Sequence, residues 1–123
     1  MVLQLKYIEL ATEGNHNGPA WIGKVEFSKS GKTMYFNGHA FKGNGHGYCH
    51  DIESGEIYWI SGVKKNGQDR HWAGSEKIMI DKNVVDEYLE YRGLQKLDLK
   101  KYIIIDDIIE TDKTKFKDMK NGS

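Results

Sequence analysis

AWIGKVEFSKSGKTMYFNGHAF, residues 20–41, is the stretch that decides the fold class. In its first half Trp21, Val25 and Phe27 lie on one face of an extended chain. A polar turn at 28–32 follows, and the second half is rich in aromatic and β-branched residues, which favours strand over helix. The stretch therefore predicts an antiparallel hairpin whose second strand continues to the end of the quoted residues.

A second informative stretch is EIYWISGVKKNGQDRHW, residues 56–72. An apolar strand at 57–63 leads into the pair Asn66-Gly67, whose residues tolerate positive φ and predict a hairpin with an exposed tip. A charged arm returns from this tip. The resulting 62–74 hairpin carries five side chains that suit ligand binding, namely Lys64, Lys65, Arg70, His71 and Trp72.

Shorter apolar runs between turn residues predict further strands over residues 3–10, 48–52 and 77–81. The isoleucine-rich residues 102–109 predict a strand that pairs with the sheet or with a partner, because its exposure to water would be costly. Residues 110–123 alternate lysine and aspartate with little to bury, so we expect a disordered charged tail.

Residues 83–92 change to helical spacing of their apolar side chains. Asp81 or Asn83 can cap the start of this helix and Gly93 can end it. About ten residues do not form a stable helix alone, so it must pack on the sheet. We expect one mainly β domain over residues 1–109 with a single core, a small antiparallel SH3-like or related barrel or curled sheet with one packed helix.

Composition narrows the classes of partner. The 123-residue chain has 18 basic and 18 acidic residues, and this balance gives no electrostatic reason to expect nucleic acid or an anionic membrane. It has no apolar stretch near the roughly 20 residues of a membrane span, and its start does not resemble a signal peptide. Cys49 is the only cysteine and cannot form an internal disulfide, so we expect a cytoplasmic protein.

The densest set of metal-capable side chains is His39, His46, Cys49 and His50, with Asp51. Zinc prefers about four nitrogen or sulfur ligands in a tetrahedron. Adjacent Cys49 and His50 would point to opposite faces of a strand, and a fourth ligand is lacking. We therefore predict no bound metal and no cofactor, with His46, Cys49 and His50 as weak candidates, and Cys49 as a small buried hydrophobe.

Asp69 and His71 suggest acid–base chemistry, because a carboxylate can orient an imidazole that titrates near neutral pH. On a strand they would share one side, with Arg70 on the other. A nucleophile such as Ser61, Ser75 or Cys49 would have to lie within reach. The alternative is a charged hairpin arm whose side chains pair with a neighbouring strand.

Aromatic residues near the basic ones suggest a stacking platform, formed from Tyr35, Tyr58, Trp59 and Trp72. Trp21 and Trp59 lie in apolar strands, so we expect both in the core. Trp72 is the candidate for an exposed aromatic anchor.

The motifs GPAWIG (18–23), DIESGEIYWISG (51–62) and DRHWAG (69–74) resemble those of a family of small, stand-alone bacterial proteins of undetermined function. The likeness covers roughly residues 1–93 and implies a bacterial cytoplasmic origin, without catalytic residues to carry over. Relatives are sometimes labelled 1-deoxyxylulose-5-phosphate synthase. That activity does not fit here, because a thiamine-diphosphate enzyme needs two α/β domains and a metal-diphosphate site.

These observations predict a non-catalytic binding or protein-interaction module that uses the 62–74 hairpin, of the adaptor or immunity type. Its partner would be a protein or a small ligand. The alternative is a small enzyme with Asp69 and His71 as acid–base residues.

Overall fold

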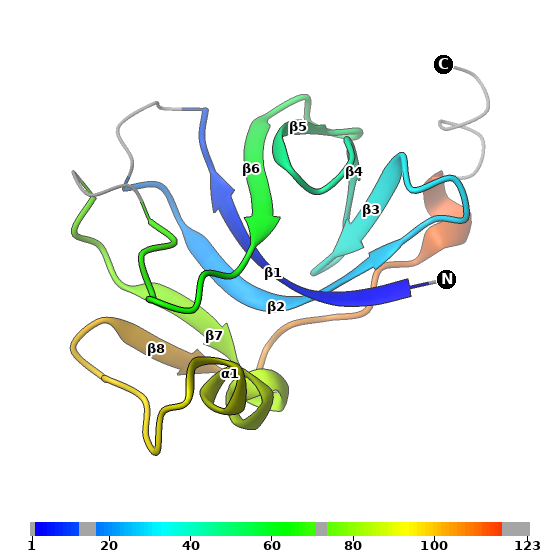
Figure 1. Cartoon of the computed structure of the whole chain (residues 1–123). Coiled ribbons are helices and arrows are strands. Elements are labelled where there is room, and N and C mark those ends of the chain that lie inside the picture. The colour runs from blue at the N-terminus through cyan, green and yellow to red at the C-terminus, as the bar shows by residue number, and fades with distance from the viewer. Residues whose placement is uncertain (1, 13–16, 71–73, 117–123) are drawn as a thin grey trace.

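The computed structural model describes residues 2–12, 17–70 and 74–116. Within them, eight strands form one sheet in the order β1-β6-β5-β4-β3-β2-β7-β8, and an additional β1–β2 pairing closes the first six into an antiparallel barrel (Figure 1). This confirms the predicted fold class. The barrel strands are β1 (Val2–Leu10), β2 (Ala20–Phe27), β3 (Thr33–Phe36), β4 (His39–Lys42), β5 (Gly47–Asp51) and β6 (Ile57–Gly62).

Strand β2 connects the barrel to an outer layer. Its end pairs with β3, where Glu26 lies opposite Tyr35, and its start pairs in parallel with β7 (Ile78–Asp81). Strand β8 (Tyr102–Ile105) continues the sheet beside β7, again in parallel. The connection between β7 and β8 contains the short 3₁₀ helix η1 (Lys82–Val84) and the helix α1 (Val85–Arg92), which lies beside them below the barrel in Figure 1.

The helix predicted at 83–92 is confirmed over Val85–Arg92 with its end signal, whereas its first residues belong to η1, and the predicted cap starts η1 instead of α1. The side chain of Asp81 accepts a hydrogen bond from the Asn83 N–H, and Gly93 ends α1 with a φ of 69°. Val84 and Tyr88 are buried against the sheet. None of the described helices is long and apolar enough to cross a membrane.

The buried apolar side chains form two main clusters, where we had expected one core. Strand β2 contributes to both because its residues alternate: Val25 and Phe27 point into the barrel, whereas Ala20 and Ile22 point to the outer layer. The barrel core also contains Ile8, Met34, Phe36, Phe41, Cys49, Tyr58 and Ile60. The outer core also contains Tyr7, Val63, Ile78, Ile80, Val84, Tyr88 and Tyr102.

Gly23 shows how the barrel core is packed. A Cβ atom at this position would lie 2.6 Å from the ring of Phe36. The missing side chain therefore leaves space for that ring, which meets Trp21 edge to face with a centroid separation of 6.4 Å.

The hairpin of β2 and β3 is confirmed, but the continuous second strand is wrong. A two-residue turn at Asn37-Gly38 divides it into β3 and β4, with Phe36 opposite His39. Both turn residues have positive φ, 50° and 81°, which asparagine and glycine tolerate better than other residues. The Asn-Gly pair was present in the sequence, and its turn preference outweighs the strand propensity of its neighbours.

The 62–74 segment also differs from its prediction. The turn exists, since the Gly67 N–H donates to the Lys64 carbonyl at 3.1 Å, but residues 68–70 are not a strand. Helix α1 holds the loop instead: the Tyr91 hydroxyl donates to the Val63 carbonyl (3.0 Å), and Arg92 Nε donates to the Lys65 carbonyl (3.4 Å). Val63 and Lys65 thus bond to helix α1, where the predicted hairpin would have bonded this arm to a second strand.

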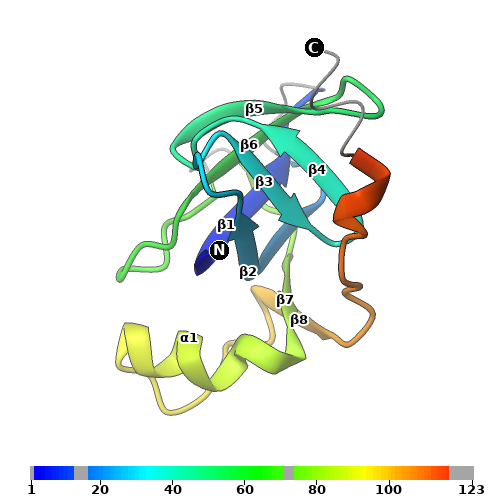
Figure 2. The ribbon, with the colours of Figure 1, turned by 90° about the vertical axis from the view of Figure 1, so that its right-hand side faces the viewer.

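The chain beyond β8 is ordered further than expected. Residues 106–111 run along the side of the barrel to the 3₁₀ helix η2 (Lys113–Phe116), which lies beside β3 and β4 (Figure 2). Phe116 is only 1% exposed and packs with Tyr35 and Ala40. The prediction of a disordered tail is therefore wrong for 110–116, because one aromatic side chain anchors a charged segment. Residues 117–123 lie outside the described residues.

Candidate functional site

Three of the five predicted binding residues of the 62–74 segment are described, and the structure does not bring these three to one surface. Lys64 and Lys65 are exposed, but Arg70 is only 9% exposed. Its guanidinium points inward and donates to the Gly18 carbonyl at 3.2 Å. His71 and Trp72 lie outside the described residues. Arg70 is therefore not on the exposed surface that the predicted hairpin required, because Asp69 and Arg70 turn inward after the loop.

Arg70 belongs to a buried polar cluster. Its guanidinium lies 3.8 Å from the carboxylate of Glu9, which also accepts a hydrogen bond from the Tyr7 hydroxyl. Burial, followed by the bond to Glu9, raises the pKa of Tyr7 far above its usual value of 10.0. Replacing one member of such a buried ion pair is strongly destabilising, so the geometry gives Arg70 a structural role.

Asp69, the proposed acid–base residue, is also buried, at 8% exposure. One oxygen accepts a hydrogen bond from the Lys64 N–H at 2.7 Å, which holds the loop in place. Burial raises the pKa of this carboxyl, against the opposing effects of that bond and of the positive charges of Lys64 and Arg92. The sequence placed Asp69 and Arg70 on opposite sides of a strand, whereas both are buried in the structure.

The weak metal candidates lie apart. His46 is exposed on the glycine-rich loop, His50 is exposed on β5, and Cys49 points into the barrel core. The Cys49 thiol donates to the Tyr58 carbonyl at 3.6 Å, and burial raises its pKa to about 12. Among the described residues, no three histidine, cysteine, aspartate or glutamate side chains gather as a metal site would require.

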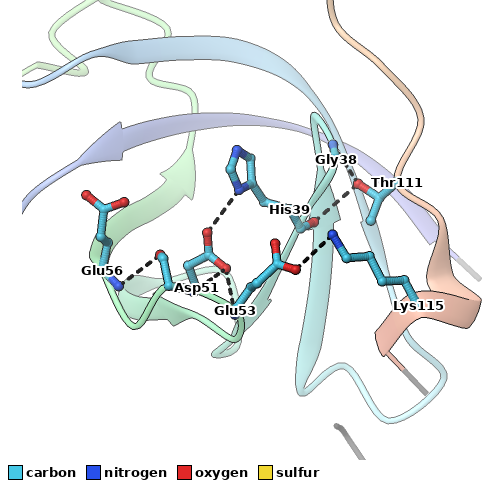
Figure 3. Close-up of polar contacts among 8 residues, drawn as sticks. Gly38, His39, Asp51, Glu53, Glu56, Thr111 and Lys115 are labelled. Atoms are coloured by element: carbon cyan, nitrogen blue, oxygen red, sulfur yellow. Dashed lines mark hydrogen bonds and ion pairs between the residues drawn. The ribbon is translucent and has the colours of Figure 1, made fainter. Parts of the chain in front are cut away.

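A second titratable pair joins β4 and β5 (Figure 3). Nδ1 of His39 lies 2.9 Å from Oδ2 of Asp51, which is 2% exposed. The other carboxylate oxygen accepts hydrogen bonds from the N–H groups of Glu53 (2.9 Å) and Ser54 (3.5 Å). Asp51 therefore organises the tight turn between β5 and β6 while it orients the imidazole.

The surroundings of His39 favour this structural role. Its ring packs against Phe41 and Tyr58, with centroid separations of 5.9 and 6.2 Å. Within the described residues, no serine, threonine or cysteine side chain hydrogen-bonds to the ring. The pair therefore consists of an imidazole and the carboxylate that orients it, with no hydroxyl or thiol hydrogen-bonded to the ring among the described residues.

The same region ties down the C-terminal segment, as Figure 3 shows. The hydroxyl of Thr111 accepts from the Gly38 N–H (2.9 Å) and donates to the His39 carbonyl (3.2 Å). Lys115 pairs with Glu53 at 2.8 Å. Sequence reasoning named His39 and Asp51 only as metal-capable side chains and missed their pairing, because the β4–β5 register and the docked C-terminal segment bring these residues together and local spacing does not.

A groove of about 280 Å³ lies between the 108–111 segment and the outer face of β2 and β3. Two of its three charged lining residues are already paired: Lys24 lies 2.8 Å from Glu87, and Glu26 lies 2.5 Å from Lys113. The third is Glu110. The groove therefore offers a ligand few available charges.

Two aromatic side chains lie outside the barrel on β5 and β6. Tyr48 is 71% exposed and Trp59 is 36% exposed, so the prediction that Trp59 belongs to the core is wrong. Their rings meet edge to face at 5.0 Å, and the Trp59 indole N–H donates to the Ser61 hydroxyl at 3.0 Å. Alternation along β6 assigns Tyr58 and Ile60 to the inside, and Trp59 therefore faces out.

Two further members of the predicted platform, Tyr35 and Tyr58, do not join this pair, and Trp72 lies outside the described residues. Tyr35 and Tyr58 are buried in the described structure, and Trp21 packs against the barrel core as expected. Lys42, His50 and Ile57 do lie beside the pair, because the register places Lys42 opposite His50 and His50 opposite Ile57. We call Lys42, Tyr48, His50, Ile57 and Trp59 the aromatic face.

Comparisons with protein-family models, with curated proteins and with solved structures each found no match to this chain.

Proposed function

We propose that this chain is a non-catalytic protein-interaction module of the bacterial cytoplasm, of the adaptor or immunity type, built on an SH3-like small barrel. Its contact surface is the aromatic face, in place of the 62–74 segment. The observation that carries this proposal is the exposed edge-to-face pair of Tyr48 and Trp59 on the outside of a closed barrel.

The geometry of the pair suits an interface anchor. Tryptophan and tyrosine dominate the energetics of protein interfaces, since they bury a large area with few rotatable bonds. The hydrogen bond to Ser61 and the contact with Tyr48 already restrain the Trp59 ring. Less side-chain entropy is then lost on binding than a free indole would lose.

The side chains beside Tyr48 and Trp59 indicate which kind of partner surface would fit. Lys42 and His50 supply basic groups, and Ile57 adds an exposed apolar side chain. A protein surface that presents apolar side chains next to carboxylates complements this combination. Binding through such a surface should weaken as the salt concentration rises, because the charged contacts are screened.

The enzyme alternative has less support. Asp69 is buried, His71 lies outside the described residues, and the His39–Asp51 pair has no nucleophile bonded to it in the described part of the chain. A cytoplasmic location agrees with the lone buried cysteine, whose raised pKa keeps it a thiol.

Variants of the aromatic face test the proposal. Partners captured by immobilised wild-type protein from a bacterial lysate would be purified and their affinities measured by calorimetry. Trp59→Ser and Tyr48→Ser should each weaken binding at least about thirtyfold, because both remove an aromatic anchor. Leu99→Ser, at a residue 61% exposed elsewhere, should leave the affinity unchanged. Partners that bind equally well to all three variants would contradict this assignment.

A further inference from the structure

Strand β8 presents a free edge. It ends the strand order of the sheet, with β7 on one side and no strand on the other among the described residues. Ile103 and Ile104 are 46% and 45% exposed. An uncovered edge of this kind is a template for pairing with another strand, and natural proteins usually block it with a charge, a proline or a bulge. Residues 102–105 contain none of these.

The hydrogen bonds to β7 determine which backbone groups remain available. The Ile78 N–H donates to the Lys101 carbonyl at 2.9 Å, so the carbonyl of Lys101 points toward β7. Successive residues of a strand direct their backbone groups to opposite edges. The carbonyl of Tyr102 and both backbone groups of Ile104 therefore point to the free edge.

The sequence around β8 is self-complementary in charge. Residues 100–107 read KKYIIIDD, two lysines before the apolar residues and two aspartates after them. All four charged side chains are exposed, and none of them forms an ion pair within the described residues. An antiparallel copy would bring lysines opposite aspartates, whereas a parallel copy would place like charges together.

We propose that two copies of this chain pair through their β8 edges, antiparallel, about a two-fold axis at Ile104. Paired residues must lie on the same face of the sheet, so the register joins odd-numbered residues to odd-numbered ones and even-numbered residues to even-numbered ones. Ile104 then exchanges both backbone hydrogen bonds with Ile104 of the partner subunit. Lys101 lies opposite Asp107 of the partner subunit, and this ion pair occurs twice because the interface is isologous.

The dimer is weak and depends on concentration. Four residues of β8 and their flanking charges bury far less than the roughly 1,200 Å² of a stable standard-size interface. The main-chain hydrogen bonds provide the affinity, and the charges set register and direction. This surface is separate from the aromatic face, so dimerisation and partner binding can be tested independently.

Sedimentation velocity over a concentration series provides the test. The wild-type mass should rise from 14.1 kDa toward twice that value. Lys101→Asp alone, or Asp107→Lys alone, should raise the dissociation constant about tenfold, since each variant creates two like-charge pairs per dimer. An equimolar mixture of the two variants should recover the wild-type affinity, because both cross-strand pairs are again of opposite charge. The double variant K101D/D107K should recover it too.

Two controls make the result decisive. Ile104→Pro removes an edge N–H that β7 does not use, so it should abolish the dimer while circular dichroism and the melting temperature stay close to wild type. Tyr48→Ser should dimerise as wild type does. A protein that remains monomeric up to about 1 mM overturns the proposal. A dimer whose dissociation constant does not change in Lys101→Asp or Asp107→Lys would also overturn it. A dimer that Tyr48→Ser abolishes would do the same.

Discussion

Asp69 has one carboxylate oxygen that is satisfied and one that is not. Oδ1 accepts the Lys64 N–H, whereas Oδ2 is buried and has no hydrogen-bond partner among the described residues. The pKa of this carboxyl is raised above 3.8 by burial, so the folded state holds the proton more tightly than the unfolded state does. The contribution of Asp69 to stability is then most favourable below about pH 4 and is lost as the pH rises through the raised pKa.

Asp69→Asn is therefore expected to stabilise the protein at neutral pH. The amide oxygen still accepts the Lys64 N–H, and the buried charge is gone. Thermal melts should show a higher melting temperature than wild type at pH 7 and little difference below pH 4. Asp69→Ala is the control: it loses the acceptor and should cost about 1–3 kcal/mol below pH 4, where wild-type Asp69 carries no charge, and less at pH 7. A lower melting temperature for Asp69→Asn at pH 7 would mean that attraction to Arg92 outweighs burial.

Cys49 should be unreactive in the folded protein. Its pKa of about 12 leaves almost no thiolate near neutral pH, and its side chain lies in the barrel core. A thiol-specific chromogenic reagent at pH 8 should label it only as fast as the protein unfolds, so the rate should rise with denaturant. The matched control is C49S/H50C, which moves the thiol to the exposed neighbouring position and should react at once. Fast labelling of native wild type would contradict the burial of Cys49.

At the residue scale, the sequence predicted which side chains share a face of a strand better than it predicted which face is buried. It correctly placed Cys49 and His50 on opposite faces and grouped Trp21, Val25 and Phe27 on one face. It could not say which face of a strand is inside, and it misplaced Trp59 for that reason. A barrel packs both sides of some strands, so an outward residue of β6 can look as apolar as an inward one.

At the element scale, the C-terminal segment shows how a single side chain can order a charged stretch. Thr111 bonds the β3–β4 turn, and Phe116 fills a site beside Tyr35 and Ala40. Few other apolar contacts hold η2, so its docking is a local equilibrium.

Phe116→Ala is expected to release this segment without unfolding the barrel. Burying a phenylalanine contributes about 1.5–3 kcal/mol, so its loss should increase the open population at least about tenfold. Trypsin cleavage after Lys113 and Lys115 should accelerate by the same factor, with an unchanged β signal in circular dichroism. Ile109→Ala, at a residue 61% exposed, should cleave at the wild-type rate. Global unfolding of Phe116→Ala would show that η2 supports the whole barrel.

The elements that the sequence predicted well are those whose ends are marked by capping or turn residues close in the chain. Asp81 caps η1 directly before helix α1, Gly93 ends α1, and β2, β5, β6 and β7 are bounded by turn residues. The prediction of a strand after Gly67 was wrong, because residues 68–70 are held by tertiary contacts: Asp69 accepts the Lys64 N–H, and Arg70 donates to the distant Gly18 carbonyl. Tertiary contacts of this kind leave no trace in local propensity.

At the scale of the whole molecule, closure of the barrel could not be derived from the sequence. It depends on β1 pairing with β2 along Val2–Glu9 and with β6 along Lys6–Leu10. Closure removes the free edges of six strands, which leaves the β7–β8 extension to present one. The two proposed contact surfaces, the aromatic face and the β8 edge, thus lie on different parts of the molecule.

The triple pairing of β2 has a consequence for cooperativity. This strand bonds to β1, β3 and β7, and its alternate side chains belong to both clusters of buried residues. Neither cluster can lose β2 and remain intact, so the barrel and the helical layer form a single unfolding unit, although their side chains do not mix. Two separate cores usually indicate two domains. Here both cores share the backbone of β2, so the barrel and the helical layer should unfold in one transition.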